Sequence, residues 1–161
     1  PAVTIAVGSL PKLGYDPNSG AEKVLTAAAK AVDKPVAGLE TAEQQLGFFD
    51  GLSNETQIKF LLVTLDQLPR LAPTLERMIS SWGKGDPDGL ALLLNEDMQE
   101  LPDVTRILLT ERNARWAAWI EARLAQPGTV FVAVGAGHLA GPDSVQAFLA
   151  KRRLTATRVA Y

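Results

Sequence analysis

The only histidine of the chain, His138, lies in a glycine-rich turn that follows an apolar run. Residues 131–134 are apolar and mostly β-branched or aromatic, which predicts a buried strand. Small residues at 135–137 then allow a tight turn, and residues 141–144 have the types that start a helix. Ligands of open α/β sheets bind at the carboxyl ends of strands, so His138 is a candidate base or metal ligand. The alternative is a histidine that only forms hydrogen bonds within its loop.

Glu40 ends a second predicted strand, residues 36–39. Parallel strands would bring Glu40 and His138 to the same edge of the sheet, where Glu40 would act as a second ligand or base. The alternative is that Glu40 only precedes a helix and favours its positive end, an effect of about 0.3–1 kcal/mol.

A third group of charged residues interrupts the apolar stripe of a long predicted helix. Leu108, Arg112 and Trp116 follow one another at intervals of four residues, so Arg112 shares a face with apolar side chains. A buried charge needs a partner, whereas an arginine at the edge of the stripe would extend past Trp116 into solvent. We predict that Arg112 is buried and stabilises developing negative charge, and that Glu111 orients Arg112 or a ligand.

Composition narrows the class of protein. A chain of 161 residues with 47% hydrophobic residues predicts one domain, residues 1–161, with a core of its own. The net charge of −2, with acids and bases interspersed, argues against nucleic-acid binding. The absence of cysteine excludes disulfides and thiol catalysis, and no apolar run is long enough for a membrane span. Because the chain begins at Pro1 without a methionine, we expect an upstream segment to be missing.

The order of the predicted elements indicates an α/β fold, a mostly parallel sheet with an inserted multi-helix region. Capping-box spacing marks helix starts at Ser19 and Thr41, and the three tryptophans at helical positions are expected in the core. Residues 1–13 form a helix or a strand. The other predicted helices cover about residues 21–32, 41–50, 53–68, 71–82, 86–98, 102–124 and 142–152, and the strands residues 36–39, 129–134 and 155–159.

Several of these motifs together resemble the TraB/GumN family, which includes the Tiki Wnt-inactivating proteases and is thought akin to erythromycin esterase. That family has two G-x-x-H motifs with conserved acidic and arginine residues. The segment 132–139, which ends in Gly-His-Leu, is similar to the second G-x-x-H motif. Residues 38–41 resemble the G-x-E position at Glu40, residues 111–113 the E-R pair, and residues 82–86 a further family segment.

The resemblance implies a metal-dependent hydrolase, peptidase-like and using Mn²⁺ or Co²⁺, that activates water at a metal near His138 and Glu40. The partner would be a peptide or small-molecule ligand, and the location the periplasm or cell envelope. The first G-x-x-H motif does not occur in this chain, and catalytic metal sites take about three protein ligands. We therefore expect the chain to be incomplete as an enzyme, with an exposed sheet edge that invites homodimerisation.

Two other functions remain open at this point. The same residues could form a non-catalytic peptide- or pheromone-binding regulatory module, whose binding would be unaffected by a chelator. They could also form a metal-free esterase in which His138 is the base.

Overall fold

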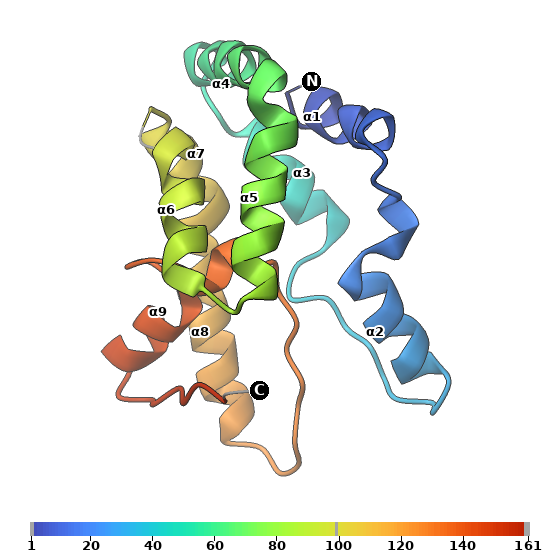
Figure 1. Ribbon diagram of the computed structural model, residues 1–161. Coiled ribbons are helices and arrows are strands. Elements are labelled where there is room, and N and C mark those ends of the chain that lie inside the picture. The colour runs from blue at the N-terminus through green and yellow to red at the C-terminus, as the bar shows by residue number, and fades with distance from the viewer. Residues whose placement is uncertain (1, 99, 160–161) are drawn as a thin grey trace. The chain divides into compact units, whose positions relative to one another are not determined.

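Helices are the regular elements of the described chain (Figure 1). The structure is a computed structural model that describes residues 2–98 and 100–159, and within those ranges it contains no strand. The predicted α/β fold with a parallel sheet is therefore wrong. The α-helices are α1 (Ala2–Ser9), α2 (Ala21–Lys30), α3 (Ala42–Asp50), α4 (Asn54–Gln67), α5 (Leu71–Gly83), α6 (Pro87–Met98), α7 (Pro102–Thr105), α8 (Glu111–Leu124) and α9 (Val145–Lys151). Shorter elements are η1 (Leu10–Leu13), η2 (Pro17–Ser19), η3 (Leu68–Arg70), η4 (Arg106–Thr110) and η5 (Ala136–Leu139).

The three segments predicted as strands, residues 36–39, 129–134 and 155–159, have irregular backbone. Their apolar side chains are not all buried, since Phe131 is 77% exposed and Val159 is 81% exposed. A run of β-branched and aromatic residues expresses a preference for strand, but a strand forms only when a second segment pairs with its backbone. Without such a pair in the described residues, the sheet edge predicted to mediate a homodimer is absent there as well.

Local capping signals account for several helix starts. The predicted capping box at Thr41 is confirmed, because Thr41 Oγ1 accepts a hydrogen bond from the Gln44 backbone N–H at 3.2 Å and the Gln44 side chain accepts one from the Thr41 N–H at 2.8 Å. Ser53 caps α4 as predicted, with its hydroxyl accepting from the Thr56 N–H at 3.2 Å. These starts depend on residues within one turn of each other, so the sequence predicts them directly.

Two predicted helix starts are wrong. Ser19 ends η2, and Gly20 precedes α2 without a side-chain cap. The C-terminal helix begins at Val145 with Ser144 as its cap, so Pro142 lies in the turn before the helix.

We expect Thr41→Ala to lower the free energy of unfolding by about 0.5–2 kcal/mol, because the Gln44 backbone N–H at the start of α3 loses its side-chain acceptor. Thr41→Ser keeps the hydroxyl and is the matched control. Urea unfolding followed by circular dichroism measures the difference. Equal stability of the alanine and serine variants would contradict the assigned cap.

The start of α3 also has a defined dependence on pH. The pKa of Glu43 is lowered from its ordinary value of 4.5, chiefly by a hydrogen bond from its own backbone N–H and secondarily by one from the Thr41 hydroxyl. A lowered carboxyl pKa stabilises the fold at pH values above the unfolded pKa, and this contribution is lost as the pH falls through the folded pKa. Glu43 therefore supports α3 at neutral pH and ceases to do so in acid.

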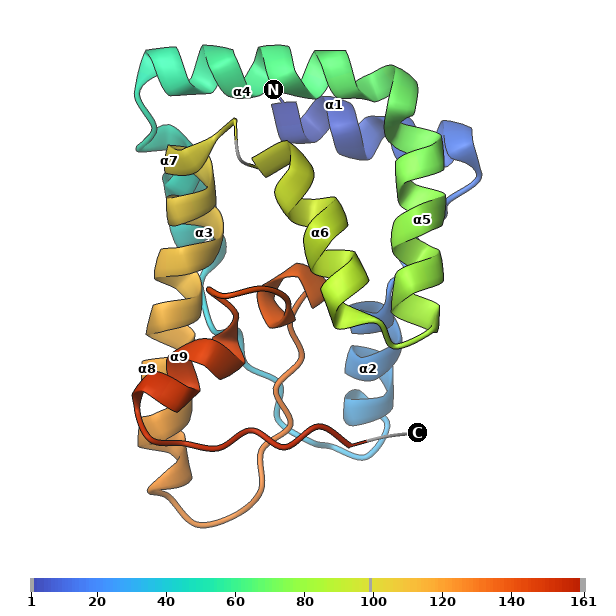
Figure 2. The same ribbon diagram turned by 60° about the vertical axis from the view of Figure 1, so that its left-hand side comes forward.

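The chain divides into two compact units, unit 1 (Pro1–Ala72) and unit 2 (Pro73–Tyr161). In unit 1, α1 packs along α4, and both views show these two helices side by side (Figures 1 and 2). Ala2, Leu52 and Thr64 are its buried residues, and the rings of Phe49 and Phe60 stack with their centroids 6.5 Å apart. Glu40 belongs to this unit.

In unit 2, α8 packs against α9, and α6 contacts both α7 and η5 (Figure 2). No helix of the described ranges has the length and apolar character that crossing a bilayer requires. Helices α6, α7, α8 and α9 and the turn before α7 supply the buried apolar residues of unit 2: Leu90, Ala91, Leu93, Leu101, Val104, Trp116, Ala117 and Val145. His138, Arg112 and Glu111 belong to this unit.

Candidate functional site

The longest predicted helix, residues 102–124, is confirmed as one helical run made of α7, η4 and α8. Its middle segment η4 is π-helical, and the Glu111 backbone N–H donates to the Arg106 carbonyl five residues earlier. A π segment adds a residue to a helical turn and is frequent at functional sites. Here it directly precedes the residues that contact His138.

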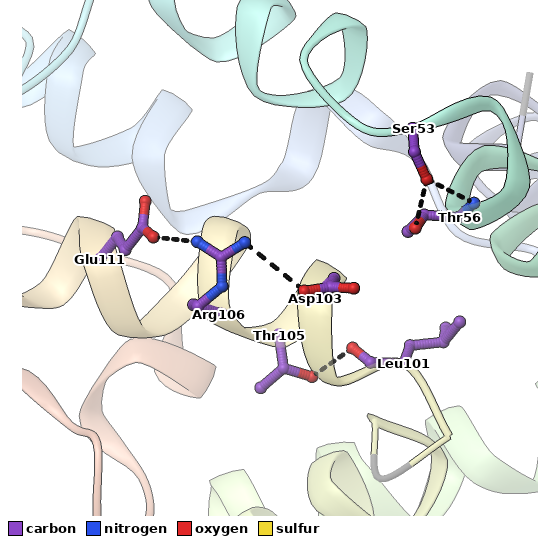
Figure 3. A network of polar contacts seen from close by, with 7 residues as sticks. All are labelled: Ser53, Thr56, Leu101, Asp103, Thr105, Arg106 and Glu111. Atoms are coloured by element: carbon purple, nitrogen blue, oxygen red, sulfur yellow. Dashed lines mark hydrogen bonds and ion pairs between the residues drawn. The ribbon is translucent and has the colours of Figure 1, made fainter.

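Ion pairs connect the two ends of η4 (Figure 3). The Arg106 guanidinium donates to the Glu111 carboxylate and also lies 3.5 Å from Asp103 Oδ1. The hydrogen bond with Glu111 raises the pKa of Arg106 above its ordinary value. Arg115 Nη1 lies 3.9 Å from the second Glu111 oxygen. Because these side chains are about half exposed, the pairs orient Glu111 more than they stabilise the helix.

The centre of the site is a hydrogen bond between His138 and Asn113. His138 Nδ1 and Asn113 Oδ1 are 2.6 Å apart, and Asn113 is only 1% exposed. Asn113 Nδ2 donates to the backbone carbonyl of Asp143 at 2.7 Å. Asn113 on α8 thus connects the turn that carries His138 with the turn that leads into α9.

These two contacts determine which ring nitrogen of His138 carries the proton. Since the Asp143 carbonyl can only accept, the Asn113 amide nitrogen must face it, and the amide oxygen faces His138. An amide oxygen can only accept, so His138 Nδ1 donates. In the neutral ring the lone pair is then on Nε2, the arrangement that a general base or a metal-binding histidine requires.

Trp116, one turn after Asn113, lies against both His138 and Arg112. The Trp116 and His138 ring centroids are 4.4 Å apart with the planes inclined at 47°, and Arg112 Cζ lies 4.9 Å from the Trp116 ring. Arg112 Nη1 also donates to the Leu108 carbonyl at 3.1 Å. Arg112 is half-buried rather than fully buried. Two of the predicted site residues, Arg112 and His138, thus meet at one indole ring.

Two residues of the long helix, Thr110 and Asn113, form hydrogen bonds with Asp143 in the turn before α9. Thr110 Oγ1 donates to Asp143 Oδ2 at 3.0 Å, next to the contact between Asn113 and the Asp143 carbonyl. Ser144 is 6% exposed, and its hydroxyl accepts from the Ala147 N–H at 3.3 Å. Ser144 therefore caps a helix.

A small cavity of about 60 Å³ lies beside this network. Thr110, Asn113 and Asp143 form its polar wall, and Leu94 and Leu109 are among its apolar residues. The space is large enough for water.

Glu40 lies at a tight bend in unit 1, directly before the cap of α3. A Cβ atom on Gly38 would lie 2.8 Å from the Glu40 carbonyl oxygen, so the bend requires glycine at that position. His138 belongs to unit 2, and the shared cleft of Glu40 and His138 stays a prediction.

The donor groups around His138 do not amount to a metal site by themselves. In the part of the chain that the structure describes, no three histidine, aspartate or glutamate side chains gather closely enough to hold a metal ion. Nδ1 of His138 is used by Asn113, and the Asp143 carboxylate accepts from Thr110. The site offers one oriented imidazole, whereas a catalytic metal takes about three protein ligands.

Sequence reasoning overlooked Asn113 as a functional residue, although it follows the predicted pair Glu111 and Arg112. The signal was present, because Asn113 lies on the buried stripe of α8 with Trp116 and Ala117. A buried amide requires hydrogen-bond partners, and the histidine turn supplies one of them.

Comparison with known proteins identifies the family. The model of the TraB/PrgY/gumN family matches residues 2–158. The chain is 33% identical over 149 residues to the uncharacterized protein YbaP of Escherichia coli K12, a match that covers 92% of this chain and 54% of YbaP. YbaP of Shigella flexneri matches with the same values. The chain thus spans about half the length of the curated relatives it matches, and no solved structure matches it. The match over nearly the whole chain confirms the resemblance seen in the motifs around Glu40, Glu111 and His138: this chain belongs to the TraB/PrgY/gumN family.

Proposed function

We propose that the protein to which this chain belongs is a hydrolase of peptide or ester bonds, and that Nε2 of His138 accepts the proton of the attacking water. The observation that supports this role is the 2.6 Å contact between His138 Nδ1 and the buried Asn113 oxygen. The Asn113 amide oxygen accepts from Nδ1 and so orients the ring with its lone pair on Nε2, the arrangement that a general base requires.

The other residues of the proposed site have supporting roles. The Arg112 guanidinium, held at the Trp116 ring, is a cation that favours negative charge developing on the substrate carbonyl. Glu111 stays the predicted orienting carboxylate, and in the described contacts it pairs with Arg106 and Arg115. Glu40 stays a predicted second base or ligand.

The family resemblance implies a metal-dependent form of the proposed hydrolysis, with Mn²⁺ or Co²⁺ as the divalent metal. Bound metal would polarise the carbonyl and acidify the attacking water. His138 and Glu40 are its predicted ligands, and the remaining ligands would come from residues outside the described site, because that site lacks a set of three.

The test uses the natural protein in its full length, with fluorogenic peptide and ester substrates, in chelator and with added Mn²⁺ or Co²⁺. We expect His138→Ala to lower kcat/KM by about 10²- to 10⁴-fold, the usual contribution of a general base. His138→Gln is the second variant, and thermal melts establish that both are folded. Loss of activity in chelator would favour the metal-dependent variant of the reaction, and activity that persists would favour the metal-free esterase.

A folded His138→Ala protein with undiminished activity would overturn the proposed base. Peptide binding without turnover under every metal condition would replace the hydrolase with the regulatory binding module.

A further inference from the structure

Helix α4 carries an apolar stripe on the side of the helix opposite its buried residues. Ile58, Leu62 and Leu65 are 59%, 60% and 44% exposed, and their spacing of four and three residues aligns them along one face. The buried residue Thr64 and the half-buried Phe60 lie on the other side of the helix. This stripe, called the α4 stripe below, has the spacing of a short helix-pairing seam.

The charged residues of α4 and η3 lie along one flank of this stripe. Their charges alternate in sign, so the same helix read in the opposite direction has the opposite charge at each of these positions. In chain order they are Glu55, Lys59, Asp66 and Arg70, with signs minus, plus, minus, plus. Read from the other end, every sign is inverted. Position 55 is paired by the reversal with 70, and position 59 with 66.

We propose that the α4 stripe is an interface between two copies of this chain, with the two α4 helices antiparallel. In that arrangement each charge faces its opposite, so Lys59 meets the Asp66 position of the second copy and Glu55 meets the Arg70 position. In a parallel second copy in register, the charged flank of one helix would face the uncharged flank of the other, so these charges would have no opposite charges to meet. The charge pattern therefore selects a second copy in one orientation, and does so independently of any catalytic role of His138.

The charged flank can change partners easily. Asp66 and Arg70 form an ion pair within the chain, with Nη2 and Oδ2 3.1 Å apart, but their side chains are 80% and 67% exposed. Exposed ion pairs of this kind contribute little to the stability of the fold, so a pair between two copies can replace this one. Leu62 lies next to the two-fold axis of the antiparallel pair, where it meets its own counterpart. Three aliphatic side chains form a small contact, so the dimer depends on protein concentration.

Sedimentation velocity of the full-length natural protein over a range of concentrations tests the interface. Lys59→Glu is expected to raise the dimer dissociation constant roughly tenfold, because two intermolecular pairs become repulsive. The double variant Lys59→Glu with Asp66→Lys restores opposite charges only in the antiparallel pair, so it should return to the wild-type value. Leu62→Glu should leave a monomer, and Val24→Glu on α2, where Val24 is 63% exposed, is the matched control.

Oxidative cross-linking reads the orientation directly. The chain contains no cysteine, so with any cysteine elsewhere in the protein replaced by serine, Leu62→Cys introduces a single thiol. It should form a covalent dimer rapidly, whereas Glu55→Cys alone should not. A protein that stays monomeric at every concentration, or a double charge variant that fails to recover, would overturn the proposal.

Discussion

Replacing Asn113 with leucine is expected to lower the free energy of unfolding by about 2–4 kcal/mol, although leucine has nearly the same size and is apolar. The site is 1% exposed, and the amide satisfies both the His138 ring and the Asp143 carbonyl. Leucine removes the partner of the His138 Nδ1–H and of the Asp143 carbonyl, two part-buried contacts, and each lost partner costs about 1–3 kcal/mol. Urea unfolding measures the loss.

An exposed asparagine provides the control for that substitution. Asn54→Leu changes an exposed position at the start of α4 and should alter stability by less than about 0.5 kcal/mol. A stability of Asn113→Leu within that margin of wild type would show that the buried network does not exist in solution.

Asn113→Asp separates the chemical role of this residue from its structural role. A carboxylate cannot donate to the Asp143 carbonyl, and its negative charge beside Nδ1 favours the imidazolium form of His138. If His138 is a base, the activity of this variant should need a higher pH than that of wild type. A lowered rate with an unchanged pH profile would leave Asn113 with a purely structural role.

The second large effect is expected at Trp116. Trp116→Ala should lower the free energy of unfolding by about 3–5 kcal/mol, because it removes a large side chain that is 6% exposed and contacts both His138 and Arg112. The cavity left behind would also release the ring of His138 on one side. Chemical denaturation measures the stability.

Trp119, on the same helix, is the matched control because it is 43% exposed. Trp119→Ala should cost less than about 1 kcal/mol. Similar losses for both tryptophans would contradict the assigned burial. The expectation that all three tryptophans lie in the core is wrong, because Trp82 and Trp119 are 60% and 43% exposed.

Most helix boundaries could be predicted from local sequence signals, because these signals act within a few residues. The Thr41 capping box and the Ser53 cap start the predicted helices, and Asp86 Oδ1 accepts from the Gly89 N–H at 2.9 Å at the start of α6. The run 102–124 is long and periodic enough to be recognised without its neighbours. Family membership is likewise a property of the sequence, because the short motifs around His138, Glu40 and Glu111 point to it and the family match extends over residues 2–158.

Features that depend on contacts between residues far apart in the sequence could not be predicted in this way. The apolar segment 129–134 had the composition of a strand, but a strand also requires a partner, which local composition does not provide. Trp116 and Trp119 differ in burial because only Trp116 faces His138 and the core of unit 2. Asn113 and His138 are 25 residues apart, and only the packing of the turn against α8 makes one the orienting partner of the other.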